Sequence, residues 1–223
     1  MLPDRFRQVL RVYWHRIYPW TALNGLDKKL VRHLQMDSGF FIEAGANDGV
    51  RQSNTYYLEK RRGWKGLLVE PVPRLAERCR KSRTKSIVEQ CILVGPEDSG
   101  RSFEVIDLDL MTFVVDQEQQ GRDTETHIQD AERVQGIKRS VLKAPGRTLS
   151  ELLDQHGVTS VDLLSLDVEG AERTVLSGLD LDRHLPKFVL VETKVPELIR
   201  ETLGKRYVLV AQLSHHDYLF RAE

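Results

Sequence analysis

The stretch FIEAGANDGV (Phe41–Val50) combines a short apolar run, an acid and two glycines that bracket Ala-Asn-Asp. The apolar run favours a buried strand. Gly45 and Gly49 would let the backbone turn sharply after that strand and approach a ligand closely. Ligands of parallel α/β sheets bind beyond the carboxyl ends of the strands. This stretch therefore predicts a first strand that ends at a ligand site.

Strand-like and helix-like segments alternate through the rest of the chain. Further strands are expected at residues 66–71, 86–94, 161–170, 188–193, 207–213 and 217–222, and helices at 53–62, 73–82, 148–157, 171–178 and 196–204. Such alternation indicates a parallel α/β sheet with helices on both faces. About three residues separate the last two strands, which is too short for a parallel crossover, so we expect the final strand to run antiparallel.

Two regions lie outside this alternation. Residues 5–20 carry apolar groups at helical spacing and predict an amphipathic helix within an N-terminal extension, residues 1–35. It would dock on the main domain, residues 36–223, or form a homodimer, with an interfacial membrane helix as the alternative. Residues 96–146 form an insert with a candidate hairpin and a polar stretch around His127, typical of a lid or acceptor-binding region.

The composition excludes several classes of function. Lys+Arg and Asp+Glu are equal at 33 each, so the net charge gives no indication of nucleic-acid binding. Cys79 and Cys91 are too few for a disulfide scaffold and are expected to be reduced and buried. No apolar run reaches the roughly 18 residues that span a bilayer. The first residues lack the apolar core of a signal peptide, so a cytoplasmic location is expected.

Polar residues gather at the predicted carboxyl ends of successive strands. In strand order they are Glu43, Gly45, Asn47, Asp48 and Gly49; Glu70; Gln90 and Cys91; Asp167, Glu169 and Glu172; Glu192; and His215 with His216. The first turn has Gly-x-x-x-Gly spacing, which differs from the G-x-G-x-x-G of dinucleotide-binding proteins. Glu43 could meet a cation, and Glu70 could accept hydrogen bonds from two ribose hydroxyls. S-adenosylmethionine, with an amino-acid end and a nucleoside end, fits this arrangement.

Seven segments together resemble the FkbM family of S-adenosylmethionine-dependent methyltransferases. They are EAGANDG (43–49), SNTYYLE (53–59), GWKGLLVEP (63–71), RTLSELL (147–153), DLLSLDVEGAE (162–172), VLSG (175–178) and HDYLF (216–220). The resemblance implies the Rossmann-like, seven-stranded class I methyltransferase sheet. It also implies methylation of a hydroxyl on a sugar, polyketide or other small natural product.

The resemblance also assigns roles to individual residues. The methionine part of the cofactor would be held by Glu43, Gly45, Asn47, Asp48 and Gly49, and the ribose by Glu70. Asn54, Gln90 and Cys91 complete the expected cofactor-binding set.

Transfer to a hydroxyl also requires a base that takes the acceptor's proton. The candidates by position are Asp167, Glu169, Glu192, His215 and His216. No dedicated metal site is expected, although Mg²⁺ held by Asp167, Glu192 and a histidine is an alternative to a protein base. A nicotinamide-dependent oxidoreductase and a non-catalytic S-adenosylmethionine-binding scaffold remain as other functions.

Overall fold

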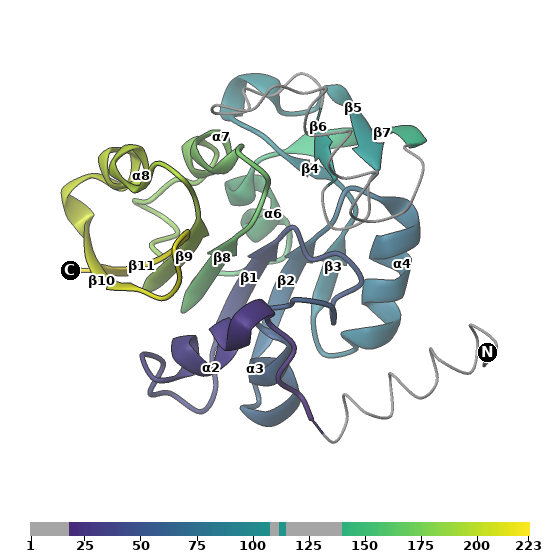
Figure 1. Ribbon diagram of the computed structural model, residues 1–223. Coiled ribbons are helices and arrows are strands. Elements are labelled where there is room, and N and C mark those ends of the chain that lie inside the picture. The colour runs from purple at the N-terminus through teal and green to yellow at the C-terminus, as the bar shows by residue number, and fades with distance from the viewer. Residues whose placement is uncertain (1–17, 108–111, 115–139) are drawn as a thin grey trace.

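The computed structural model describes residues 18–107, 112–114 and 140–223. Its main feature is a seven-stranded sheet in the order β10-β11-β9-β8-β1-β2-β3 (Figure 1). The strands are β1 (Phe40–Ala44), β2 (Lys65–Val69), β3 (Ile87–Glu89), β8 (Leu163–Leu166), β9 (Phe188–Glu192), β10 (Tyr207–Gln212) and β11 (Asp217–Ala222). β11 runs antiparallel to both β9 and β10, which confirms the expectation from the short final connection.

Helices cover both faces of this sheet because alternate side chains of each strand are apolar on both sides. Phe41 of β1 packs with α2 (Leu26–Val31), α3 (Tyr56–Arg61) and α4 (Pro73–Ser82). Its neighbour Ile42 packs with α6 (Leu149–Gln155), α7 (Glu172–Ser177) and α8 (Pro196–Leu203) on the opposite face. Among the described residues there are also three short 3₁₀ turns, η1 (Leu23–Gly25), η2 (Pro96–Asp98) and η4 (Gly204–Arg206). The predicted fold class is therefore confirmed.

Local sequence signals explain several helix ends. The Thr148 hydroxyl accepts a hydrogen bond from the Glu151 N–H, and the Glu151 carboxylate accepts one from the Thr148 N–H, which together form a capping box. Pro73 and Pro196 occupy the first turns of α4 and α8, where a missing N–H costs nothing. Gly157 has φ 63° just beyond α6, a conformation that glycine adopts without steric cost.

The prediction of a single strand at residues 86–94 is wrong. The chain leaves the large sheet after Glu89, and Gln90 and Cys91 lie between β3 and the separate strand β4 (Ile92–Leu93). β4 pairs with Gly146 and Arg147 in a second, four-stranded sheet, in the order β4-β7-β5-β6. One apolar run thus contributes a strand to each of the two sheets, because β3 pairs with β2 and β4 pairs with β7.

The second sheet builds much of the predicted insert. β5 (Ser102–Asp107) pairs antiparallel with β6 (Phe113–Val114), which confirms the expected hairpin. β5 also pairs along its whole length with β7 (Ser140–Arg147), a strand that the sequence did not indicate. Figure 1 places this sheet beyond the carboxyl ends of β1 and β2. The polar stretch around His127 lies outside the described residues, so its role as a lid stays a prediction.

Part of the predicted N-terminal extension packs on the sheet. Leu26, Leu30 and Leu34 are buried in the same cluster as Phe41, and Trp20 stacks on Tyr57 with ring centroids 3.6 Å apart. Most of the amphipathic helix expected at residues 5–20 lies outside the described residues. The domain boundary at residue 35 and the homodimer therefore remain predictions. Within the part of the chain that the structure describes, no helix is long and apolar enough to cross a membrane.

Candidate cofactor and active site

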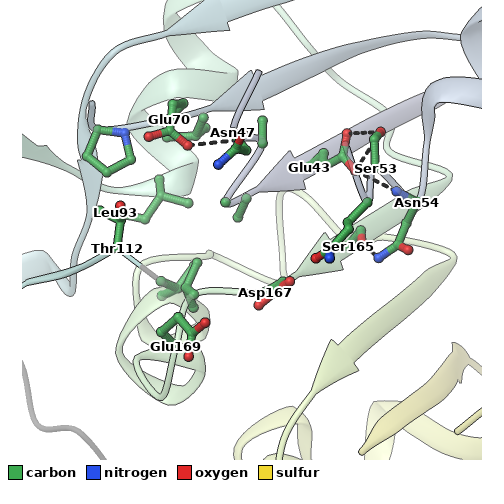
Figure 2. A pocket seen from close by; sticks show the side chains of 18 of the residues that line it. Glu43, Asn47, Ser53, Asn54, Glu70, Leu93, Thr112, Ser165, Asp167 and Glu169 are labelled. Carbon is green, nitrogen blue, oxygen red and sulfur yellow. Dashed lines mark hydrogen bonds between the residues drawn. The ribbon is translucent and has the colours of Figure 1, made fainter. Parts of the chain in front are cut away.

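A pocket opens at the carboxyl ends of β1, β2 and β8, next to the second sheet (Figure 2). It is lined by Glu43, Ala44, Gly45, Ala46, Asn47, Arg51, Gln52, Ser53, Asn54, Val69, Glu70, Pro71, Cys91, Ile92, Leu93, Thr112, Ser165, Asp167, Val168, Glu169 and Val175. Figure 2 shows Glu70 and Glu43 at opposite ends of the pocket, with Asp167 and Glu169 on a wall between them. The pocket is therefore elongated, with an acid at each end.

Gly45 allows the strands β1 and β8 to meet closely at the floor of the pocket. Its φ is 81°, and a Cβ at this position would lie 1.9 Å from the backbone oxygen of Asp167. No side chain fits there, so glycine is required by both its backbone conformation and its surroundings. Asn47, two residues on, also has a positive φ of 49°, which asparagine tolerates better than most residues. Glycine at position 45 and asparagine at position 47 therefore allow the tight turn that follows β1.

Glu70 lies at one end of the pocket, where it is 4% exposed. Its Oε2 accepts a hydrogen bond from the Asn47 N–H at 2.8 Å, and its Oε1 accepts one from the Val72 N–H at 2.9 Å. Burial raises the pKa of Glu70 to about 7, and the two backbone donors oppose part of that rise. An ionised carboxylate oxygen has room for a second donor. Glu70 can therefore accept one further hydrogen bond on each oxygen, as a pair of ribose hydroxyls requires.

Glu43 lies at the opposite end, but its carboxylate is engaged by the protein. It accepts hydrogen bonds from the Ser53 hydroxyl at 2.9 Å, the Asn54 N–H at 2.8 Å and the Thr55 hydroxyl at 2.7 Å. The Arg83 guanidinium adds a further contact at 3.2 Å. Glu43 thus borders the pocket while organising the loop from β1 to α3. The expected contact between its carboxylate and a cation of the ligand stays a prediction.

The structure keeps Asp48 and Gly49 off the pocket wall. Asp48 Oδ1 accepts hydrogen bonds from the N–H groups of Val50 and Arg51, at 3.0 and 2.8 Å, and so stabilises the turn. Gly49, with φ 77°, packs against α4, where a Cβ would lie 2.7 Å from Cγ of Arg83. Both residues shape the loop and do not line this pocket, and their expected contact with the cofactor stays a prediction.

Of the two residues that follow β3, Cys91 lines the pocket and Gln90 does not. The Gln90 side-chain amide donates to the backbone oxygen of Pro71 at 3.0 Å and does not reach the pocket wall. Cys91 does line the pocket, beside Ile92 and Leu93. Burial raises the pKa of the Cys91 thiol to about 12, so it is a neutral, apolar contact surface.

Asp167 and Glu169 are the two predicted base candidates that line the pocket. Asp167 follows β8 directly, and its side chain is accessible from the cavity although protein surrounds it on the other sides. Asp167 is exposed to the cavity, but the protein packed around its carboxyl raises its pKa above the usual range, and the negative charges of Glu192 and Glu169 add to this rise. Glu169 has φ 54°, a strained conformation for a residue other than glycine. Asp167 is thus a carboxyl that can hold or release a proton at the middle of the pocket.

Glu192, His215 and His216 lie next to this wall but outside the pocket lining. Glu192 ends β9, opposite Asp217 of β11. His216 Nε2 is 3.8 Å from Glu192 Oε1 and 3.7 Å from Asp217 Oδ2. His215 packs edge-on against His216. Of the five predicted base candidates, the structure therefore brings two to the pocket and places three beside it.

The described residues contain no group of three or more His, Cys, Asp or Glu side chains arranged to hold a metal ion. The magnesium alternative required Asp167, Glu192 and a histidine to converge. Asp167 faces the pocket, whereas Glu192 and His216 form their own contact at the β9 end. The described part of the chain does not assemble that ligand set.

Sequence reasoning missed several residues of the site. Ser53 and Ser165 both line the pocket, and Ser165 Oγ accepts from the Asn54 side-chain amide at 3.2 Å. Ser165 is a polar residue inside an otherwise apolar strand, opposite Glu43 in the register of β1 and β8. A single polar residue within an apolar strand was the signal that could have identified Ser165 as part of the site. Thr112 reaches the pocket from the second sheet, which no local pattern indicated.

The comparisons agree with this geometry. Residues 43–220 match the Methyltransferase FkbM domain. The chain is 24% identical over 216 residues to the 2-O-methyltransferase NoeI of Sinorhizobium fredii (strain NBRC 101917 / NGR234), covering 91% of this chain and 83% of that protein. A seven-stranded, mostly parallel sheet with an antiparallel strand near one end is the fold of a class I methyltransferase. The chain belongs to the FkbM methyltransferase family and is an S-adenosylmethionine-dependent methyltransferase.

Two solved structures are also similar in fold. A TehB-like SAM-dependent methyltransferase from Corynebacterium glutamicum aligns with 99% of this chain and 100% of its own, with a TM-score of 0.43 and 12% identity. An RNA methyltransferase from Salinibacter ruber in complex with S-adenosyl-L-homocysteine aligns over 88% of each chain, with a TM-score of 0.38 and 13% identity.

Proposed function

We propose that the protein methylates a hydroxyl group on a sugar, a glycan or another small natural product. The observation that carries this proposal is the position of Asp167, a carboxyl with a raised pKa on the wall between the two ends of the pocket. Such a group can take the proton that a hydroxyl must lose. The relative named as a 2-O-methyltransferase supports the same choice of acceptor atom.

The pocket residues fit the cofactor in one orientation. Glu70 accepts from the ribose hydroxyls, because each of its oxygens has one backbone donor and room for another. Pro71, Ile92 and Leu93 form the apolar surface beside it and suit the adenine. The methionine end lies toward Asn54, whose main-chain N–H is fixed by Glu43 and whose side chain is fixed by Ser165. Glu43 thus acts on the cofactor through the loop it holds.

S-adenosylmethionine supplies an already activated methyl group, so the chain contributes chiefly binding, alignment and the exclusion of water. Asp167 is our proposed base, and Glu169 contacts the acceptor from the same wall. Glu192 acts on Asp167 from outside the pocket lining, because its charge contributes to the raised pKa of Asp167. Mg²⁺-assisted transfer is tested by chelation: activity that survives EDTA excludes a dissociable metal.

The proposal is tested with a panel of oligosaccharides and glycosides, S-adenosylmethionine and mass spectrometry. We expect one methyl group on a hydroxyl oxygen of an acceptor. Replacing Asp167 with Asn should lower kcat by about 10²–10⁴, the range of general-base contributions, and leave binding of S-adenosylhomocysteine within a few-fold. The exposed Glu197, on α8, provides the control Glu197→Gln, which should keep full activity.

Three outcomes would contradict parts of the proposal. Methylation at nitrogen alone would overturn the choice of acceptor atom. Full activity of Asp167→Asn would remove Asp167 as the base. Tight binding of S-adenosylhomocysteine without turnover of any acceptor would favour the non-catalytic scaffold. The oxidoreductase alternative finds no support, because the chain belongs to a methyltransferase family.

A further inference from the structure

Arg83 is a fully buried cation that the function described so far does not use. It lies directly after α4, at 0% exposure, between the rings of Phe41 and Tyr56, whose centroids are 5.1 and 5.7 Å from its guanidinium carbon. A buried charge is costly unless its partners compensate it completely. The contacts of Arg83 should therefore explain why its charge is buried.

The guanidinium of Arg83 contacts five acceptors. Nε donates to Glu59 at 2.9 Å, one terminal nitrogen donates to Glu43 at 3.2 Å, Ser53 Oγ at 3.1 Å and the Gly49 carbonyl at 3.0 Å, and the other donates to Thr55 Oγ1 at 2.8 Å. Three of these acceptors, Gly49, Ser53 and Thr55, lie between β1 and α3, and Glu43 lies within the last two residues of β1. A single side chain thus ties together the whole connection from β1 to α3.

The charges around Arg83 are balanced. Arg83 and Lys60 face the carboxylates of Glu43 and Glu59, and Lys60 Nζ lies 2.9 Å from Glu59. Burial alone would raise the pKa of Glu59, but the charge of Arg83 and hydrogen bonds from Ser86 and Lys60 bring it below its usual value. The Glu59 carboxylate therefore remains an ionised acceptor for Arg83.

The loop held in this way is one wall of the cofactor pocket. Arg51, Gln52, Ser53 and Asn54 all line the pocket, whereas Arg83 does not. Asn54 also reaches across to Ser165 at the end of β8. Anything that loosens the connection at Gly49, Ser53 or Thr55 releases this wall from its position next to the cofactor's methionine end.

We propose that Arg83 is a positioning residue, which sets the affinity for S-adenosylmethionine by preorganising the loop of residues 49–55 from behind the pocket. A preorganised loop binds more tightly because it loses less conformational freedom on binding. Only an arginine supplies this function fully: a lysine keeps the charge but has three N–H donors in place of five, and they lack the planar fork.

The test compares Arg83→Lys with a control that loses stability elsewhere. Leu203→Ala removes a buried side chain of α8, on the opposite face of the sheet. Binding of S-adenosylhomocysteine is measured by calorimetry at a temperature where all three proteins are folded, and loop mobility by amide hydrogen exchange. We expect Arg83→Lys to weaken binding at least tenfold and to speed exchange in residues 50–55, while Leu203→Ala stays within twofold of wild type.

Two results would overturn the proposal: wild-type affinity in Arg83→Lys, or an equal loss in Leu203→Ala, which would reduce the effect to general stability. Thr55→Val provides a milder variant if Arg83→Lys does not fold. It removes the hydroxyl that accepts from Arg83 and donates to Glu43, and Thr55 does not line the pocket. A weaker affinity with faster loop exchange in Thr55→Val supports the proposal, and unchanged affinity overturns it.

Discussion

At the scale of single residues, Glu70 links the chemistry of the pocket to pH. Its pKa of about 7 means that a proton competes with the ribose hydroxyls for the carboxylate near neutrality. Protonation removes an acceptor and adds a donor, so the protonated form binds the ribose less well. Affinity for the cofactor is therefore highest above pH 7 and falls as the pH decreases below 7.

We therefore predict that the dissociation constant of S-adenosylhomocysteine rises about tenfold between pH 8 and pH 6, because one pH unit below the pKa leaves roughly a tenth of the carboxylate ionised. Calorimetric titrations at several pH values measure this. Glu70→Gln, which does not titrate, should bind more weakly and with no such dependence. A wild-type affinity that is flat across this range would contradict the proposed contact.

The same buried carboxyl affects stability in the absence of ligand. The pKa of Glu70 is higher in the folded protein than in the unfolded chain, so the folded state binds the proton more tightly. Stability therefore falls as the pH rises from about 4.5 to 7, the window between the unfolded and folded values. A bound cofactor that requires the ionised form would offset this loss.

Residue scale is also where the sequence was least informative. Glu43 and Glu70 were recognisable as acids after strands, and both border the pocket. The partners of Glu43 were not recognisable, because Arg83 is 40 positions away and contacts it only after α4 has packed on the sheet. Which acid remains free to bind a ligand depends on such distant neighbours, and no local pattern encodes them.

At the scale of secondary-structure elements, the contact between the ends of β1 and β8 determines the floor of the pocket. Gly45 and Gly100 have nearly the same positive φ, 81° and 79°. A Cβ on Gly45 would collide with the Asp167 carbonyl, whereas one on Gly100 would meet nothing within 4 Å. Alanine substitutions at the two glycines therefore separate the energetic cost of a positive φ from that of a steric clash with the Asp167 carbonyl.

We predict that Gly100→Ala lowers the free energy of unfolding by about 1–2 kcal/mol, the cost of the left-handed conformation alone. Gly45→Ala should cost several kcal/mol more, as displaced strand ends require, and should abolish binding of S-adenosylhomocysteine. Urea denaturation and calorimetry measure the two effects. Equal destabilisation by both substitutions would show that the strands can separate without cost, contrary to this account.

Elements with strong local signals were predictable, and those that depend on pairing were not. The helix expected at residues 148–157 and the short final hairpin were correctly anticipated. The break at Gln90 was missed because an apolar run continues across it. β7 was missed because Pro145 and Gly146, both unfavourable within strands, lie near its end, and its pairing with β5 compensates for them.

At the scale of the whole molecule, the pocket lies where the order of the strands reverses. From β1, the chain builds toward β3 on one side and, after the second sheet, from β8 through β9 on the other. Helices on opposite faces leave a crevice at such a reversal, and ligands of open α/β sheets bind there. Topology places the pocket, and the residues after β1, β2 and β8 give it its chemistry.

The central claim is that this pocket binds S-adenosylmethionine with Glu70 on the ribose. Calorimetric titration of the wild-type protein and of Glu70→Ala with S-adenosylhomocysteine, with NADH as the control ligand, tests it most directly. We expect a one-to-one complex for the wild type, at least tenfold weaker binding for Glu70→Ala, and no heat with NADH. No heat with S-adenosylhomocysteine, or the same affinity in both proteins, would contradict it.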